Sequence, residues 1–159
     1  MDINVILTGL IAPVAVLLVK TLLDFSLAHF LVKYISWIPT RGMFRDNPHD
    51  LSGLWEQTWG AAGSPNFQPD TARHGQATIK QFGRYCFAEF VAKGRRYQLF
   101  GKIRNNYLIG EWYDKSDKNA YFGAFELQIN IHGLEGRYVG HSSRDGKVGQ
   151  DVWIWSRVN

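Results

Sequence analysis

The sequence predicts a mainly β protein, a small up-and-down barrel of about eight strands preceded by one or two N-terminal transmembrane helices. Three observations predict it. The residues from Ile3 to Val19 carry no formal charge, as in a membrane-spanning segment. From Leu51 onward, short segments alternate apolar and polar residues, as half-buried strands do. Turn sequences rich in glycine and asparagine separate these segments, as tight connections between antiparallel strands require.

The first element is an uncleaved membrane anchor. A helix of roughly 20 apolar residues crosses a bilayer core of about 30 Å. The stretch from Ile3 to Leu23 reaches that length if Lys20 lies near the membrane surface with its stem buried. A cleaved signal peptide is the alternative, but Met1 and Asp2 provide no Lys or Arg, and no small-x-small cleavage site follows the apolar run.

The second element is a shorter apolar stretch, Phe25 to Ile38, whose polar residues fall on one stripe of a helix. The stripe consists of Ser26, His29, Lys33 and Ser36. Two interpretations remain open. The stretch is a second transmembrane helix whose stripe faces neighbouring subunits and lines a pore, or it is an interfacial helix in the headgroup layer, anchored by Tyr34 and Trp37.

The cations beside the membrane predict a cytoplasmic barrel. Arg41 and Arg45 follow the apolar stretches, whereas no Lys or Arg precedes the first, and the flank with Lys or Arg faces the cytoplasm. The single cysteine, Cys86, agrees, because one thiol cannot form an intramolecular disulfide. We read Cys86 as a small buried side chain. The predicted organisation is a membrane anchor over 1–40, a linker over 41–50 and a cytoplasmic barrel over 51–159.

A recurring apolar-x-Gly-x-aromatic pattern predicts that the sheet closes on itself. In a strand the first, third and fifth residues share a face, so each copy presents a large residue, a gap and a large residue inward. Glycine inside a strand is typical of a sharp bend or a close approach. The copies are Leu51–Trp55, Leu108–Trp112, Tyr121–Phe125 and Leu134–Tyr138, with Leu99–Ile103 as a looser one.

Eight strands fit between the turn sequences. The hairpin signals are Asn105-Asn106, His132-Gly133 and Asp145-Gly146. A barrel of this size holds its own side chains or one small ligand. The longest loop, 60–75, is either a binding loop at the barrel mouth or a disordered connection. The strands are expected near 51–60, 75–82, 84–92, 95–104, 107–114, 120–131, 134–143 and 149–158.

Catalytic motifs are missing from the sequence. The five histidines do not have metal-ligand spacing, and Ile103 stands where a phosphate-binding loop ending in Gly-Lys would need Ser or Thr. No Gly-x-Ser-x-Gly sequence is present. We therefore expect a protein that is not an enzyme and that needs no cofactor.

Positive charge indicates an anionic ligand. The chain has a net charge of +4, and one basic run holds Lys93, Arg95, Arg96, Lys102 and Arg104. This run attracts anionic headgroups or nucleotides, or it is a solvated hairpin. Arg84 shares its strand phase with Cys86, and an inward cation needs an anionic or aromatic partner. Arg157 shares phase with inward tryptophans, but stacking on Trp55 gives it a structural role.

The order of motifs resembles a known family. Behind the membrane segment come LSGLW, LIGEW, YFGAFEL, LEGRYVGHS and the terminal VWIWSR. This order is similar to that of the two-transmembrane, β-strand-rich effectors of bacterial cyclic-oligonucleotide antiphage signalling. The resemblance implies an inner-membrane protein whose cytoplasmic barrel binds a cyclic di- or trinucleotide made by a partner nucleotidyltransferase. It also implies that the protein then forms a homo-oligomer whose membrane helices breach the bilayer and stop growth of the infected cell.

A cyclic oligonucleotide needs aromatic faces for its bases and cations for its phosphates. The stacking candidates are Trp59, Tyr85, Tyr97, Trp112 and Tyr138. The phosphate candidates are Arg84 and then Lys80, Arg104 and Arg157. The runner-up function is a membrane-tethered, lipocalin-like barrel that binds an apolar ligand, and a structural assembly module is a third. Arg84 separates the first two, because a nucleotide site needs it buried against a cavity and a lipid carrier does not.

Overall fold

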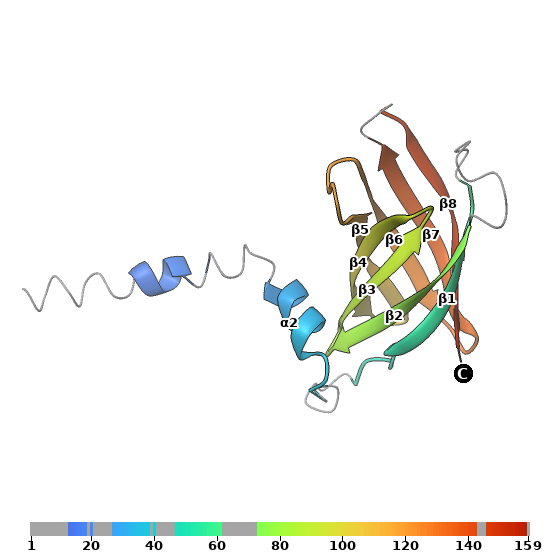
Figure 1. Ribbon diagram of the computed structural model, residues 1–159. Helices are drawn as coiled ribbons and strands as arrows, with labels where there is room; N and C mark the ends of the chain where they lie inside the picture. The colour runs from blue at the N-terminus through green and yellow to red at the C-terminus, as the bar shows by residue number, and fades with distance from the viewer. Residues whose placement is uncertain are drawn as a thin grey trace, which may run out of the picture.

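The structure is a computed structural model that describes residues 13–18, 20, 27–38, 40, 47–61, 73–142 and 146–158. Its main body is a closed antiparallel barrel with the helix α2 (Leu27–Ile35) outside it (Figure 1). The strands are β1 (Gly53–Trp59), β2 (His74–Phe82), β3 (Tyr85–Ala92), β4 (Arg95–Arg104), β5 (Tyr107–Asp114), β6 (Tyr121–Ile129), β7 (Gly133–Ser142) and β8 (Val148–Arg157).

The topology is the predicted up-and-down barrel. Each strand pairs with the next, and β1 pairs with β8 to close the sheet. Strand bounds agree with the predicted ones to within two residues. Three of the connections are two-residue turns, at 83–84, 93–94 and 105–106. Lys93, Gly94 and Asn105 have positive φ angles of 48°, 73° and 52° there, as primed hairpin turns require.

Glycines lie where neighbouring strands come closest, as the repeated pattern predicts. Gly101 pairs with Gly110 between β4 and β5, and Gly123 pairs with Gly140 between β6 and β7. A Cβ atom on Gly123 would overlap the carbonyl oxygen of Val139. The missing side chains therefore allow these strands to bend around the lumen.

The two ends of the barrel differ. At the end where β1 begins and β8 finishes, which we call the base, Trp55 is buried and its Nε1–H donates to the carbonyl oxygen of Leu51 at 2.8 Å. The guanidinium of Arg157 lies 5.7 Å from the Trp55 ring centroid and donates to the Ser52 carbonyl. We call the opposite end, between Trp59 and the β3–β4 turn, the mouth.

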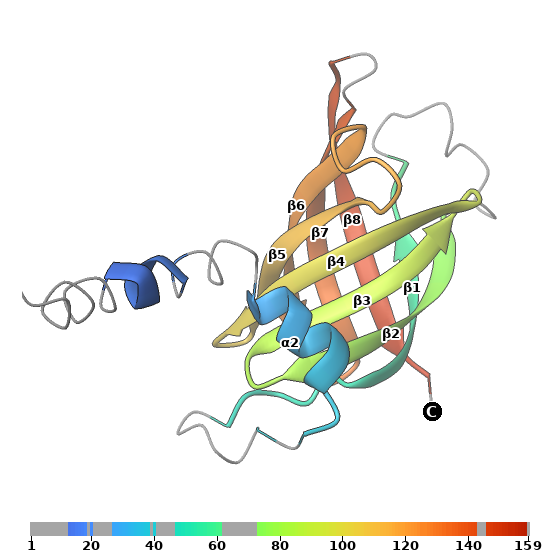
Figure 2. The ribbon, with the colours of Figure 1, turned by 60° about the vertical axis from the view of Figure 1, so that its left-hand side comes forward.

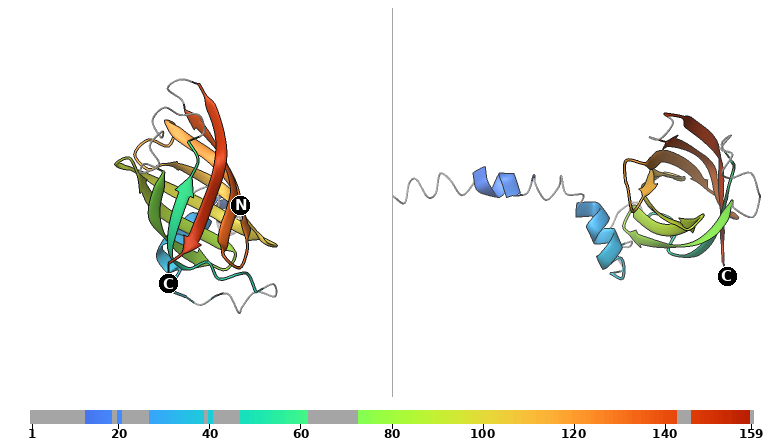
Figure 3. Two further views of the ribbon diagram at one scale, coloured as in Figure 1. Left: turned by 90° about the vertical axis from the view of Figure 1, so that its right-hand side faces the viewer. Right: turned by 45° about the horizontal axis from the view of Figure 1, so that its top comes forward.

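Helix α2 lies against the outer wall of the barrel, next to β2 and β3 (Figures 2 and 3). Val32 on its inner face is fully buried. The amide of Gly83 donates to Thr40 Oγ1 at 3.0 Å, which joins the segment after α2 to the β2–β3 turn. The helix is therefore part of the same folded unit as the barrel.

Within the described ranges, no helix is both long enough and apolar enough to cross a membrane. Most of the predicted anchor, Ile3–Leu23, lies outside those ranges; residues 13–18 and 20 of it are helical. Ser26 and the predicted linker residues 41–46 also lie outside them.

Candidate functional site

A layer of aromatic rings crosses the lumen of the barrel near the mouth. Five rings contact one another in a closed circuit, with centroids 5.4 to 6.2 Å apart. Trp59 joins the circuit through Phe90 at 6.2 Å. We call this set the aromatic layer; it consists of Phe90, Tyr97, Trp112, Tyr138 and Trp153.

Strand register explains how such large rings fit. Trp112 on β5 faces Gly123 across the ladder, and Trp153 on β8 faces Gly136. A Cβ atom on Gly140 would lie 3.0 Å from Trp112 Cζ2. The Trp112 indole thus lies against the space that Gly123 and Gly140 leave, so this part of the aromatic layer depends on the glycine pattern.

The structure gathers four of the five predicted stacking residues at this layer. Trp59, Tyr97, Trp112 and Tyr138 belong to it or contact it. Tyr85 does not, because it lies on the outer face of β3, where its ring stacks on Phe100 at 5.9 Å. Lys102 Nζ lies 5.2 Å from the Tyr85 ring centroid.

The two phenols of the layer both have a raised pKa. Burial raises the pKa of Tyr97 to about 12, with a contribution from Asp114. Burial also raises the pKa of Tyr138 to about 12; Asp151 adds to this shift and Arg73 opposes it. The Tyr138 hydroxyl donates to the Gly60 carbonyl oxygen at 2.7 Å. The Trp59 amide donates to the Arg73 carbonyl oxygen at 2.9 Å, so Arg73 lies at the same end of the barrel as the Tyr138 hydroxyl.

An ion pair between the partly exposed Arg95 and the buried carboxylate of Asp114 lies at the mouth beside the layer. Arg95 Nη1 donates to Asp114 Oδ2 at 3.0 Å, and the Ser116 amide donates to Asp114 Oδ1 at 2.8 Å. The Asp114 side chain is 1% exposed, while that of Arg95 is 46% exposed and lies over the Tyr121 ring. Burial alone would raise the pKa of Asp114, but the bonds from Ser116 and Arg95 lower it.

Three buried N–H groups in the lumen have no hydrogen-bond partner within the described part of the chain. They belong to Gln57 Nε2, Trp112 Nε1 and Trp155 Nε1. The Gln57 carbonyl oxygen does accept a bond from Trp153 Nε1 at 2.9 Å. Buried donors of this kind usually bond to ordered water or to a ligand.

The structure does not bring the predicted phosphate residues together at the layer. Arg84 lies half-buried in the β2–β3 turn, because Phe82 pairs with Tyr85 and leaves Gly83 and Arg84 as the turn. Lys80 Nζ donates to the Lys33 carbonyl oxygen on the outer wall. Arg104 is exposed at the end of β4 near the base, and Arg157 stacks on Trp55.

Among the described residues, Arg73 and Arg95 are cations that lie near the layer. The sequence places Arg95 in a basic run, but β4 extends from the mouth to the base. Lys93, Arg95 and Arg96 therefore lie at the mouth, and Lys102 and Arg104 lie toward the base. Asp114 was missed, although it shares strand phase with Trp112 and so points inward. Arg73 gave no signal, because the residue precedes β2 outside any alternation.

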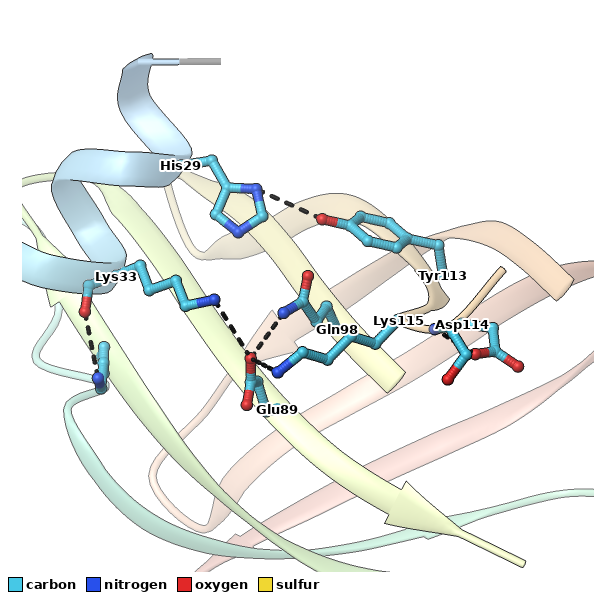
Figure 4. Close-up of polar contacts among 9 residues, drawn as sticks. His29, Lys33, Glu89, Gln98, Tyr113, Asp114 and Lys115 are labelled. Atoms are coloured by element: carbon cyan, nitrogen blue, oxygen red, sulfur yellow. Dashed lines mark hydrogen bonds and ion pairs between the residues drawn. The ribbon is translucent and has the colours of Figure 1, made fainter. Parts of the chain in front are cut away.

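Two residues of the polar stripe, His29 and Lys33, face the barrel wall (Figure 4). His29 lies over Phe87 and Phe100, with ring centroids 4.9 and 5.4 Å away, and its Nδ1 lies 3.4 Å from the Tyr113 hydroxyl. Lys33 Nζ lies 3.6 Å from Glu89 Oε1. Ser36 is half-buried in the turn after the helix.

Other site types find little support in the described residues. No group of three His, Cys, Asp or Glu side chains there could hold a metal ion. Cys86 is fully buried, and burial raises the pKa of its thiol. A cavity of about 170 Å³ lies at the base, lined by His49, Asp50, Trp55, His132 and Arg157 among others. It is at the other end of the barrel from the aromatic layer.

Comparison of the chain with models of known protein families, with curated proteins and with solved structures found no match.

The Arg95–Asp114 pair makes stability depend on pH. The pKa of Asp114 is lowered in the folded state. The ionised carboxylate therefore adds to the free energy of unfolding above its unfolded pKa of about 3.9, and this contribution is lost as pH falls through the folded pKa. We expect Asp114→Asn to be less stable at neutral pH but to lose less stability than wild type between about pH 5 and about pH 2. Thermal melts across this range measure it, with the exposed Glu126→Gln as control. If Asp114→Asn and wild type lost the same stability over this pH range, the pH dependence would not come from Asp114.

Proposed function

We propose that the chain is a membrane-associated effector that binds a cyclic oligonucleotide second messenger at the mouth of its barrel. The observation that carries the proposal is the gathering of Trp59, Tyr97, Trp112 and Tyr138 at one end of the lumen. Base stacking on an aromatic side chain contributes about 1 to 3 kcal/mol per base. An aromatic end of this kind suits a ligand with two or three flat bases.

Charge at the mouth supports an anionic ligand. Arg95 keeps about half of its side chain exposed while it pairs with Asp114, so it has N–H groups directed to the surroundings. Arg73 lies at the same end, where its carbonyl oxygen accepts a hydrogen bond from the Trp59 amide. In this proposal Arg73 and Arg95 take the phosphate-binding role that the sequence suggested for Lys80, Arg84, Arg104 and Arg157.

The proposed role includes the other features that the family resemblance implies. The ligand comes from a partner nucleotidyltransferase active during phage infection. The chain is held at the bacterial inner membrane with its barrel in the cytoplasm, and ligand binding leads to a homo-oligomer that disrupts the membrane. The protein has no catalytic activity of its own in this scheme.

A lipocalin-like barrel for an apolar ligand is the second candidate. The position of Arg84 favours it, since this residue lies in a turn rather than within the lumen. The lumen is also lined mainly by apolar and aromatic side chains. This candidate needs no cation at the mouth.

Binding to the detergent-solubilised full chain tests the proposal. We expect calorimetry against a panel of cyclic di- and trinucleotides to detect binding by at least one. Arg73→Gln should weaken that binding about ten- to a hundredfold, because a hydrogen bond to a charged group contributes about 1.5 to 3 kcal/mol. The matched control is Arg137→Gln, an exposed arginine on the outer face of β7. Its affinity should equal that of wild type.

Two results would contradict the proposal. If no cyclic nucleotide binds while a fluorescent fatty acid does, the apolar-ligand barrel is the better description. If a nucleotide binds but Arg73→Gln and Arg137→Gln have the same affinity as wild type, the mouth is not where the phosphates lie.

A further inference from the structure

Helix α2 presents its aromatic residues outward, away from the barrel. Phe30, Tyr34 and Trp37 are 55%, 59% and 79% exposed. Phe30 and Tyr34 are four residues apart, which places them on one face of the helix, and their rings contact each other at 4.8 Å. Trp37 follows in the turn after the helix. A helix on the surface of a soluble domain normally has the opposite arrangement, with its apolar face against the core.

The contacts on the other face fix this rotation of the helix. His29 packs on Phe87 and Phe100, and Lys33 lies near Glu89. Glu89 also accepts hydrogen bonds from Gln98 at 2.6 Å and from Lys115 at 3.2 Å. Turning α2 to hide its aromatic face would break this network and expose Phe87, which is 2% exposed now.

The chemistry of the outward face fits the interface of a lipid bilayer. Trp and Tyr prefer the headgroup level, where their rings are in an apolar layer and their polar atoms are in a wet one. The chain before α2 is apolar, and its described helical residues Val14, Val16, Leu17 and Leu18 are 48% to 68% exposed. Cations lie beside the helix and suit anionic headgroups; they are Lys33, Lys115 and Lys118.

We propose that α2 lies in the headgroup layer with Phe30, Tyr34 and Trp37 toward the lipid and with His29 and Lys33 on the barrel. The inference rests on the membrane association in the proposed function and adds the orientation. The wall made by β2 and β3 is then the side of the barrel nearest the bilayer. In the closed strand order the opposite wall, made by β6 and β7, is directed away from it. His29 and Lys33 act as barrel contacts in this arrangement, rather than as the lining of a pore.

Site-directed fluorescence on the full chain tests the orientation. Tyr34→Cys and Trp37→Cys are labelled with an environment-sensitive NBD dye and reconstituted into vesicles of phosphatidylcholine and phosphatidylglycerol. The native Cys86 is 0% exposed and stays unlabelled. The matched control is Ile154→Cys, an exposed position on β8, a strand that is not part of the wall against which α2 packs and that β1 separates from β2. We expect blue-shifted emission at positions 34 and 37 and quenching by lipids with a nitroxide near the headgroup, with neither effect at position 154.

Flotation of the same vesicles separates this inference from the proposed function. If the protein does not float with the vesicles, the proposed membrane association itself fails. If it floats but the dyes at 34 and 37 behave like the dye at 154, only the orientation is wrong, and a second copy of the chain or solvent covers this face. Stronger quenching by a nitroxide at the bilayer centre than by the shallow one would overturn the interfacial position in favour of a spanning helix.

Discussion

Replacing Trp153 by alanine is expected to lower the free energy of unfolding by about 3 to 5 kcal/mol, the usual loss for a buried tryptophan. Trp153 is 3% exposed and contacts rings from β3, β6, β7 and β8 across the lumen. Its indole N–H is also the donor to Gln57. The variant therefore loses packing against several strands and leaves a buried amide without that bond.

Urea titration of the full chain in detergent measures this loss. Trp153→Phe separates the two causes, because it keeps a ring in the lumen and removes only the donor; we expect it to lose about 1 to 3 kcal/mol. Ile154→Ala is the matched control, since Ile154 is the next residue along β8 and points outward at 41% exposure. Similar losses at 153 and 154 would mean that the lumen is not the core of the barrel.

Replacing Gly110 by alanine is expected to destabilise the barrel by at least about 3 kcal/mol, at or above the upper end of what overpacking costs. A Cβ atom there would overlap the carbonyl oxygen of Phe100 and lie 2.5 Å from the Cα of Gly101. Both atoms belong to the backbone of β4, so neither can turn aside as a flexible side chain would. The β4–β5 ladder must open to admit a single methyl group.

Gly75→Ala is the control for this variant. A Cβ atom at Gly75 would meet the Val91 carbonyl oxygen at 3.3 Å, which a small shift accommodates. Its free energy of unfolding should stay within about 1 kcal/mol of wild type, because alanine also reduces the conformational freedom of the unfolded chain. Thermal melts followed by circular dichroism compare the two variants. A Gly110→Ala melt that overlays that of Gly75→Ala would refute a backbone role for the glycine pattern.

The sequence predicts the barrel well because its signals are local. Alternation and hairpin turns each span only a few residues, and the resulting strand bounds are confirmed by the structure. Closure depends on non-local pairing of β1 with β8, yet the repeated glycines already indicate curvature. The arrangement of the eight described strands thus follows from patterns that can be read one strand at a time.

The environment of α2 is harder to predict. Helical periodicity identifies the stripe of His29, Lys33 and Ser36, but it does not predict which part of the protein packs against these residues. Three strands complete its surroundings, with Phe87, Phe100 and Tyr113. These residues lie more than 50 positions further along the chain, and strand phase alone gives them as outward-facing residues.

The candidate site is predicted in part for a similar reason. Strand phase correctly places Trp112 and Tyr138 in the lumen, because both lie well inside their strands. Strand phase fails at Arg84, because the sequence predicts the start of a strand there, whereas residues 83 and 84 form the turn between β2 and β3. At the end of a strand a shift of one residue changes the direction of a side chain. Strand phase therefore does not tell which cations at the mouth and base face the lumen and which face outward.

Closure of the sheet restricts how copies of this chain can assemble. Open sheets extend from molecule to molecule by pairing the unsatisfied N–H and C=O groups of their edge strands. Each of the eight described strands already has two neighbours, because β1 pairs with β8, so that route is closed. Any oligomer must be held together by side chains of the outer wall, by the connections or by the N-terminal segment. Its strength should then respond to surface substitutions and to salt, and little to changes inside the lumen that leave the barrel folded.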